Sequence, residues 1–249
     1  MPKLDRVTTD VCRKTSDDEK ICLPSIAALN LGHATRPKPL QRAAVSTLKS
    51  AGAETLIFSE YVDKKYSDET RALLWDYGFK SVLVSDPCEY TKGRWHNQIL
   101  IASNSLVTSR CAYTDGPDEL GATNTLSFNV DGYSVTGLRI PMYKTSAQWN
   151  GYWDWIDEVV CSDIVIGDFN CDPRRGKLRD RRLARFAEIK SMQIVTGENS
   201  PSYFGKNGTC STVDHALVGS KVRVNRAIYV QDGIAPTLSD HAAILVDFN

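Results

Sequence analysis

The sequence lacks a net charge and a long apolar run, and it contains only four histidines. Because 30 Lys and Arg balance 30 Asp and Glu, any attraction for a polyanion must come from a local cluster of charge. No apolar stretch approaches the roughly 20 residues of a membrane-spanning helix, so we expect no membrane contact. Residues 1–6 (MPKLDR) include three charged side chains, and no apolar signal-peptide region follows them. These absences favour a cytoplasmic protein.

The seven cysteines form no recognisable disulfide or metal-binding pattern. Their number is odd and their spacing irregular, which indicates reduced thiols. Cys12 and Cys22 flank a charged loop whose length matches no zinc motif. Cys171 has no histidine close to it in the sequence, so we interpret it as a small filler after a strand rather than a nucleophile.

No internal repeat and no linker rich in Pro, Gly or Ser divides the chain. The hydrophobic fraction of 42% is sufficient for a sizeable core at a length of 249 residues. We therefore expect a single domain over residues 25–249, preceded by a polar N-terminal arm over residues 1–24.

Short apolar runs alternate with amphipathic segments along the chain. Strands are predicted at the run that ends at Asp168 and over residues 25–31, 54–60, 80–85, 97–103, 106–113, 211–218, 222–230 and 241–248. Helices are predicted over residues 37–50, 68–77, 147–161 and 177–190. Asp131-Gly132 favours a two-residue turn, so residues 123–140 are expected to form a hairpin. This mixture predicts an α/β fold in which helices cover sheets.

Two segments join an apolar run to a cluster of polar side chains: residues 164–170 (IVIGDFN) and residues 238–244 (LSDHAAI). The first places Asp168 and Asn170 at the end of a buried strand, and the second places Asp240 and His241 at the start of one. Metal-assisted attack of water on a phosphate needs oxygen ligands for a hard cation, an acceptor for the proton of water and donors for the phosphoryl oxygens. The alternative for Asp168 and Asn170 is simple turn formation after a strand.

Three further polar residues accompany these segments. Asn30 and Glu60 precede both segments, and Asp214 lies between them. The whole pattern resembles the endonuclease/exonuclease/phosphatase superfamily over about residues 25–248. The resemblance implies a four-layer α/β sandwich with two central mixed β-sheets flanked by helices. It also implies a phosphoric ester hydrolase that uses Mg²⁺ or Mn²⁺.

The resemblance implies that Glu60 is the principal metal ligand, that Asn30 assists at the metal or the phosphate, and that Asp240 binds the metal or holds the site together. A carboxylate that ends an apolar run suits a sheet rim, because an unpaired charge is costly in the interior. A surface position for Glu60, and a turn capped by Asn30, are the alternatives. Many relatives carry an acidic residue where this chain has Gly32, so we expect a site with one metal.

The resemblance assigns the proton and phosphate chemistry to four other residues. Asp168 would orient and activate the water, and Asn170 would donate to the phosphoryl oxygens. His241 would contact the scissile phosphate, and Asp214 would pair with His241, fixing its tautomer and raising its pKa. His215, next to Asp214, could form local contacts of its own.

Two positions depart from the family pattern. Arg139 stands where relatives carry Tyr or His, and a guanidinium there could clamp a phosphate. The alternative for Arg139 is a surface charge on an edge strand. Asn97 lies in a segment where relatives have an apolar run, and we expect it to line the cleft.

Residues 173–186 are strongly basic and begin just after Asn170. Arg174, Arg175 and Lys177 are therefore predicted to contact phosphates. The alternative is a helix whose arginines are solvated, with a buried face formed by Leu178, Leu183 and Phe186.

Aromatic residues suggest a second kind of substrate contact. Tyr203 lies where nucleases of the family wall the pocket for a base or abasic sugar. Four further aromatics have helical spacing, which is typical of core residues rather than of a stacking platform: Trp149, Tyr152, Trp153 and Trp155.

We therefore predict a divalent-metal-dependent phosphodiesterase, most simply a nuclease whose partner is DNA or RNA. One alternative is a phosphatase or phosphodiesterase acting on a small or lipid phosphate ester, and the sequence has no apolar membrane-facing loop to support a lipid substrate. Another is a non-catalytic binding protein on the same fold. Retention of the whole polar set argues against the latter, because a degenerate site tends to lose such residues.

Overall fold

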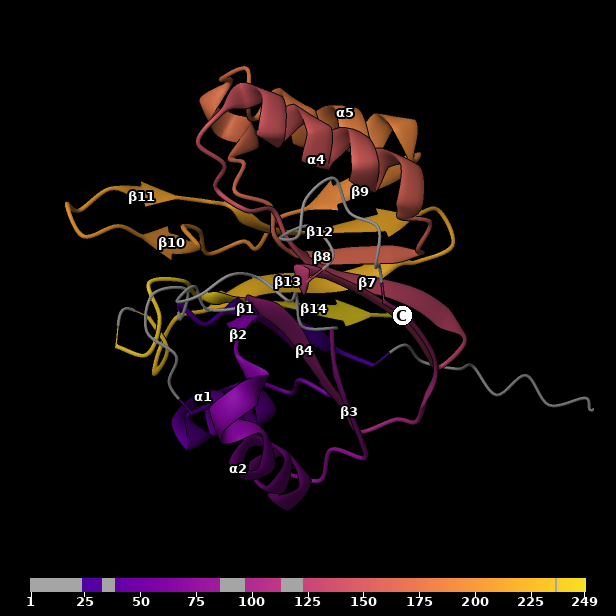
Figure 1. The fold of residues 1–249 in the computed structure, drawn as a ribbon, viewed down its shortest axis with the longest axis vertical. Coiled ribbons are helices and arrows are strands. Elements are labelled where there is room, and N and C mark those ends of the chain that lie inside the picture. Colours follow the sequence, from indigo (N-terminus) through magenta and orange to yellow (C-terminus); the bar gives the residue numbers. More distant parts are fainter. Residues whose placement is uncertain (1–23, 33–38, 86–96, 113–122, 236) are drawn as a thin grey trace, which may run out of the picture.

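The computed structural model describes residues 24–32, 39–85, 97–112, 123–235 and 237–249 (Figure 1). The expected N-terminal arm lies outside this part of the chain, apart from Pro24. Cys12 and Cys22 also lie outside it.

Two six-stranded sheets form the centre of the molecule (Figure 1). In spatial order, the first contains β13 (Val224–Val230), β14 (Ala243–Phe248), β1 (Ile26–Asn30), β2 (Thr55–Tyr61), β4 (Gln98–Ser103) and β3 (Ser81–Val84). The second contains β5 (Val107–Ala112), β6 (Thr125–Val130), β7 (Tyr133–Arg139), β8 (Ile164–Asp168), β12 (Asp214–Gly219) and β9 (Met192–Val195). β1 runs parallel to β2, and β7 to β8, while their other neighbours are antiparallel, so both sheets are mixed. A separate short pair consists of β10 (Tyr203–Phe204) and β11 (Cys210–Ser211).

Helices cover the outer faces of the sheets and complete four layers (Figure 1). α1 (Arg42–Ser50) and α2 (Asp63–Asp76) cover the first sheet, and α4 (Ser146–Val159) and α5 (Arg181–Ile189) cover the second. A 3₁₀ turn, η1 (Pro173–Arg175), follows β8. The predicted sandwich with two mixed sheets is therefore confirmed. None of the described helices is long and apolar enough to cross a membrane.

The two sheets pack face to face through aliphatic side chains such as Ile57, Ile99 and Ile166. Gly137 on β7 marks a close approach, because a Cβ there would lie 2.7 Å from Ile57 Cγ2. A separate cluster packs α4 and α5 against the second sheet and buries Trp149, Tyr152 and Trp153, as their helical spacing predicted.

The predicted hairpin is formed by β6 and β7. Val130 pairs with Tyr133 across the two-residue turn. Asp131 and Gly132 have positive φ angles of 47° and 81°, as a turn of type I′ requires.

Several predicted boundaries are wrong. α1 begins at Arg42, because the preceding Gln41 has an extended backbone with φ −81° and ψ 129°. α2 begins at Asp63 rather than Asp68. α5 begins only at Arg181, because residues 178–180 form a separate turn in which the Asp180 N–H donates to the carbonyl of Lys177 at 2.9 Å.

Candidate active site

The polar ends of neighbouring strands meet at one edge of the two sheets (Figure 1). Arg139 at the end of β7 is in register with Asp168 at the end of β8, and Asp168 pairs with Asp214 at the start of β12. Asn30 ends β1 in the other sheet. A cleft of about 800 Å³ opens here, between the two sheets and the segment that leads into β14.

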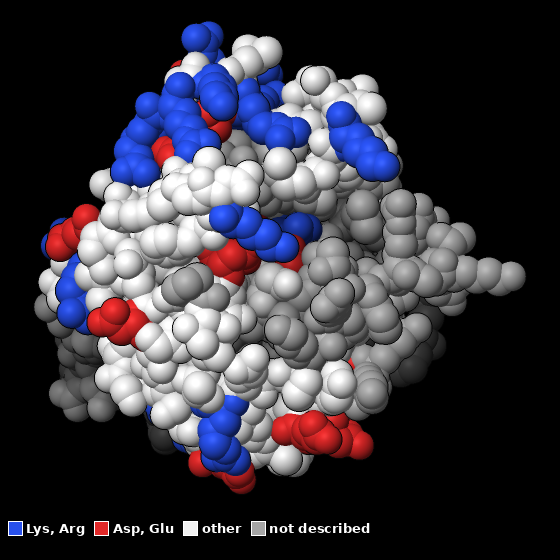
Figure 2. Space-filling view, turned by 90° about the vertical axis from the view of Figure 1, so that its left-hand side faces the viewer, with Lys and Arg blue, Asp and Glu red and all other residues white. Residues whose placement is uncertain are grey.

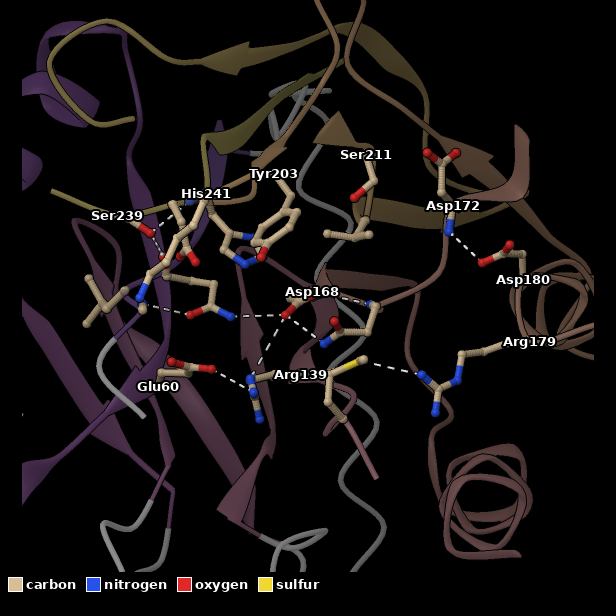
Figure 3. A pocket seen from close by; sticks show the side chains of 18 of the residues that line it. Glu60, Arg139, Asp168, Asp172, Arg179, Asp180, Tyr203, Ser211, Ser239 and His241 are labelled. Carbon is tan, nitrogen blue, oxygen red and sulfur yellow. Dashed lines mark hydrogen bonds and ion pairs between the residues drawn. The ribbon is translucent and has the colours of Figure 1, made fainter. Parts of the chain in front are cut away.

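Asp168 is held in one orientation by hydrogen bonds to both of its carboxylate oxygens (Figure 3). The backbone N–H of Asn170 donates to Oδ1 at 2.9 Å. The side-chain amides of Asn30 and Asn170 donate to Oδ2 at 3.0 and 2.9 Å. The Asn170 amide also donates to the carbonyl of Ile140 at 2.8 Å, so both of its N–H bonds are engaged within the protein. In this arrangement Asn170 positions Asp168.

Gly167 allows β8 to approach β7 directly before Asp168. Its φ is 147°, and a Cβ at this position would overlap the carbonyl oxygen of Leu138. Any side chain at Gly167 would therefore push the two strands apart and move Asp168.

Burial raises the pKa of Asp168 to about 6. The charge of His241 opposes this rise, and the charge of Asp214 adds to it. Asp168 is therefore ionised at neutral pH and basic enough to take a proton from a water molecule.

His241 and Asp214 form a buried pair, with His241 Nδ1 2.9 Å from Asp214 Oδ2. Burial opposes a charge on the imidazole, but the Asp214 carboxylate outweighs this and raises the pKa of His241 to about 9. Ser239 fixes the segment, because its hydroxyl donates to the carbonyl of Asn30 at 2.6 Å and accepts from the His241 N–H at 3.0 Å. His241 is therefore a fixed cation at neutral pH.

His215 has a structural position. Its Nε2 lies 3.0 and 3.1 Å from the carbonyls of Cys171 and Thr212, and its Nδ1 lies 3.1 Å from Thr196 Oγ1. Burial lowers the pKa of His215. Successive residues of a strand face opposite sides, so the side chain of His215 lies on the other side of β12 from that of Asp214.

Arg139 and Glu60 form an ion pair across the cleft (Figure 3), with 2.6 Å between Nη2 and Oε1. Arg139 Nε also lies 3.9 Å from Asp168 Oδ2. Glu60 is directed here by a bulge, because the register of β2 against β4 shifts between Phe58 and Tyr61 and Glu60 has a φ of 57°. Bulges re-aim side chains, and such strained backbone is typical of functional sites. β7 is an internal strand, so Arg139 is not a charge on a sheet edge.

Oxygen atoms that suit a hard cation line the same cleft, on Glu60, Asn30 and Asp240. Asn30 Oδ1 accepts a hydrogen bond from the Gly32 N–H at 2.9 Å. Asp240 Oδ1 lies 3.0 Å from the point that a Cβ of Gly32 would occupy. Asp240 thus brings a carboxylate to the space that the missing side chain of Gly32 leaves open. This donor set fits Mg²⁺ or Mn²⁺.

A second group, formed by Asp168, Asp214 and His241, places its ligand atoms within 4.8 Å of one another. Its polar atoms are already engaged, since His241 bonds Asp214 and Asp168 accepts three hydrogen bonds. The raised pKa values of Asp168 and His241 suit this group to proton transfer.

The residues predicted to bind substrate divide into two sets. Arg175, Lys177 and Tyr203 line the cleft, and the Tyr203 ring centroid lies 5.0 Å from that of His241. Arg174 and Asn97 are not among the lining residues. Arg174 pairs instead with Asp172 and hydrogen-bonds Ser200 and Thr212.

Arg179 and Lys206 also line the cleft, although the sequence did not single them out. Arg179 is one of many charges in the basic segment, and its distinguishing contact, with Cζ 4.0 Å from the ring centroid of Trp149, depends on tertiary packing. Lys206 lies between β10 and β11, whose two-residue strands leave no periodic pattern in the sequence.

A four-layer sandwich with a fixed carboxylate, a charged imidazole and further carboxylate and amide oxygens at one sheet edge holds groups that suit the hydrolysis of a phosphoric ester. Residues 27–241 match the endonuclease/exonuclease/phosphatase family, and the chain belongs to this family. No curated protein sequence matches the chain significantly.

Solved structures with the same fold cover 91% of this chain. One is a variant of the Neisseria 3′ phosphatase NExo bound to a product DNA hairpin, with 13% identity, a TM-score of 0.69 and full coverage of that chain. Another is an AP endonuclease from Archaeoglobus fulgidus, with 16% identity, a TM-score of 0.67 and full coverage of that chain. A third is the endonuclease domain of the telomere-specific non-LTR retrotransposon TRAS1, with 13% identity, a TM-score of 0.58 and 99% coverage of that chain.

Proposed function

We propose that this protein is a divalent-metal-dependent phosphodiesterase that hydrolyses DNA or RNA. The observation that carries the proposal is the geometry of the buried groups Asp168, Asp214 and His241, whose polar atoms lie within 4.8 Å of one another, and the opposite charges that this geometry favours on Asp168 and His241. Burial raises the pKa of Asp168 to about 6, whereas Asp214 raises the pKa of His241 to about 9. At neutral pH the site therefore offers a proton acceptor and a charged donor side by side, as activated-water attack on a phosphate requires.

Each group has a distinct role in the proposed reaction. Asp168 accepts a proton as the water oxygen attacks phosphorus and the P–O bond to the leaving group breaks. The leaving oxygen departs with the bonding pair and takes a proton from solvent. His241, kept charged by Asp214, donates a hydrogen bond to a phosphoryl oxygen that gains negative charge. Arg139 offers its guanidinium to the same phosphate.

Glu60, Asn30 and Asp240 would hold the Mg²⁺ or Mn²⁺ ion, which supplies positive charge to the phosphoryl oxygens when bound. A nucleic-acid substrate is supported by three features. The cleft is lined by Arg175, Lys177 and other cations. The family includes nucleases, and the neighbours of known structure include two endonucleases and a phosphatase bound to DNA.

The test is cleavage of labelled single-stranded, duplex and abasic DNA and of RNA, with Mg²⁺, Mn²⁺ or EDTA. We expect EDTA-sensitive cleavage that falls about 10²–10⁴-fold in Asp168→Asn, because a general base contributes about this much. His241→Asn should also lose most activity. Arg223→Gln, an exposed charge on the turn after β12, is the control and should cleave like the wild type.

Cleavage that persists in EDTA, or that Asp168→Asn retains, would contradict the proposal. Hydrolysis of a small ester such as bis(p-nitrophenyl) phosphate, with every nucleic acid left intact, would identify a small-molecule phosphodiesterase instead.

A further inference from the structure

A basic surface extends from the cleft over η1 and the first turns of α5. The chain from Pro173 to Phe186 contains seven Lys and Arg and a single Asp. Figure 2 shows Lys and Arg gathered at the top of the face that carries the cleft, at the level of α4 and α5 in Figure 1, while acidic side chains lie lower at its centre. Although the total charge of the protein is zero, its positive charge is therefore concentrated on one side of the site.

Several of these cations are held by the protein itself. Arg182 pairs with Asp154 at 2.7 Å and with Asp157 at 3.3 Å, which fastens α5 to α4. Arg174 and Arg175 both pair with Asp172. These pairs hold the backbone of the segment in place beside the cleft.

Three other cations have no such partner. Lys177, Arg181 and Arg185 are exposed and form no ion pair with any residue that the structure describes. The acidic groups near them are Asp180, which is buried at the N-cap of α5, Asp157, which Arg182 already pairs, and the exposed Glu188 toward the other end of α5. The start of α5 therefore carries an excess of positive charge.

Apolar side chains are exposed among these cations. Leu178, between Lys177 and Arg179, is 82% exposed, and Met142 on the wall of the cleft is 60% exposed. These two side chains add apolar contact area to the basic surface beside the cleft. A partner that carries both regular negative charge and flat apolar groups fits this surface better than an isolated phosphate ion, and a nucleic-acid strand has both.

We propose that a nucleic-acid strand leaves the cleft along this surface, so that the enzyme holds a polymer well beyond the scissile phosphate. Lys177 lies at the mouth of the cleft, and Arg181 and Arg185 follow on one face of α5. With a rise of 1.5 Å per residue, these two arginines lie about 6 Å apart along the helix axis, which is close to the distance between successive phosphates of one strand. The proposal rests on the proposed function, since it names the extent and path of that substrate.

The test measures binding rather than cleavage, so that the two proposals can fail separately. Fluorescent oligothymidylates of about 4 to 16 nucleotides are titrated in EDTA at several salt concentrations, with fluorescence anisotropy as the readout. Affinity should rise with length until the surface is filled. Arg181→Gln/Arg185→Gln should reduce the slope of log K against log salt by about 1.4, because each lost phosphate contact removes about 0.7 on a single strand.

Two controls separate this surface from total charge. Lys221→Gln/Arg223→Gln removes the same charge from the turn between β12 and β13, at the opposite end of these strands from Asp214, and should leave the slope unchanged. Arg181→Lys/Arg185→Lys should retain it. An unchanged slope in Arg181→Gln/Arg185→Gln, an equal loss in the Lys221 and Arg223 variant, or affinity independent of length would overturn the proposal. If the binding test fails in one of these ways while the wild type still cleaves nucleic acid, the proposed path of the strand is wrong and the proposed function stands.

Discussion

The ion pair between Glu60 and Arg139 places a fixed positive charge against the carboxylate best suited to bind a cation. Their closest atoms are 2.6 Å apart, and both side chains are largely buried. A metal ion at Glu60 must share that carboxylate with the guanidinium. Arg139 therefore weakens metal binding while it supplies positive charge for a phosphate, and the two effects can be separated by mutation.

Arg139→Met should bind Mn²⁺ about tenfold more tightly, equivalent to about 1.4 kcal/mol, because the competing charge is gone. Cleavage should nevertheless fall about 10²-fold, as when a donor to a developing oxyanion is removed. Calorimetry or electron paramagnetic resonance measures the affinity. Arg226→Met, which breaks an exposed pair with Asp247, is the matched control. Unchanged or weaker Mn²⁺ binding in Arg139→Met would contradict this account.

The buried pair of His241 and Asp214 predicts how the stability of the metal-free protein depends on pH. The folded state raises the pKa of His241 from 6.5 to about 9. The folded protein therefore binds a proton more tightly than the unfolded chain, so this contribution is complete below about pH 6.5. It is lost as the pH rises to about 9, and its size is on the order of 3 kcal/mol.

Urea unfolding in EDTA across pH 6 to 10 measures this dependence. In Asp214→Asn the imidazole loses its counter-charge, so the fall in unfolding free energy between about pH 6.5 and 9 should disappear. Asp247→Asn, the same change at an exposed pair, should keep it. Cysteines of the unfolded chain also titrate in this pH range, but they do so equally in both proteins. The difference in unfolding free energy between wild type and Asp214→Asn therefore reports the pair of His241 and Asp214 alone. A constant difference across this range would show that His241 is neutral in the folded state.

At the scale of elements, the site depends on how closely the strands approach one another. Gly137 lies between the sheets, where a Cβ would be 2.7 Å from Ile57 Cγ2 and 3.3 Å from Ile99 Cγ2. Gly137→Ala should lower the unfolding free energy by about 1–3 kcal/mol through overpacking. Gly151 is inside α4, where a Cβ would meet open space, so Gly151→Ala should raise the unfolding free energy by about 0.5–1 kcal/mol.

Urea midpoints of the two variants test this contrast directly. Both substitutions add one methyl group, so opposite signs can arise only from the space around each glycine. If Gly137→Ala were as stable as the wild type, the sheets would have to be further apart than the structure has them.

The strands and helices with a clear period could be predicted from the sequence. The hairpin at Asp131-Gly132 and the buried face of α4 follow from local chemistry, and the structure contains both. The start of α5 could not be predicted, because residues 177–180 favour a helix locally but form a separate turn in the fold. β10 and β11 have two residues each, too few for any pattern to emerge.

The same distinction applies to the site. Asp168 follows an apolar run and His241 precedes one, so the sequence indicates that they lie at the ends of buried strands. The ion pair of Glu60 with Arg139 could not be predicted, because it depends on the bulge in β2 and the positive φ of Glu60, which arise from pairing with β4. The engagement of both Asn170 N–H bonds likewise depends on the position of Ile140.

At the scale of the whole molecule, metal binding should appear as stability. A ligand that binds only the folded state stabilises it by about 2.7 kcal/mol at one hundred times its dissociation constant. For a chain of 249 residues this corresponds to a rise in Tm of about 5–10 °C. The size of the rise reports occupancy of the cleft without requiring that the substrate be known.

Glu60→Gln should abolish most of this rise in Mn²⁺, because it replaces the carboxylate that the bulge in β2 directs into the cleft. Glu54→Gln is the matched control, since Glu54 is exposed just before the other end of β2 and does not line the cleft. Differential scanning calorimetry of the three proteins with Mn²⁺ and with EDTA measures the effect. An equal rise in all three would place the cation elsewhere, with the buried group of Asp168, Asp214 and His241 as the next site to test. No rise in the wild type would contradict the proposed metal site at Glu60.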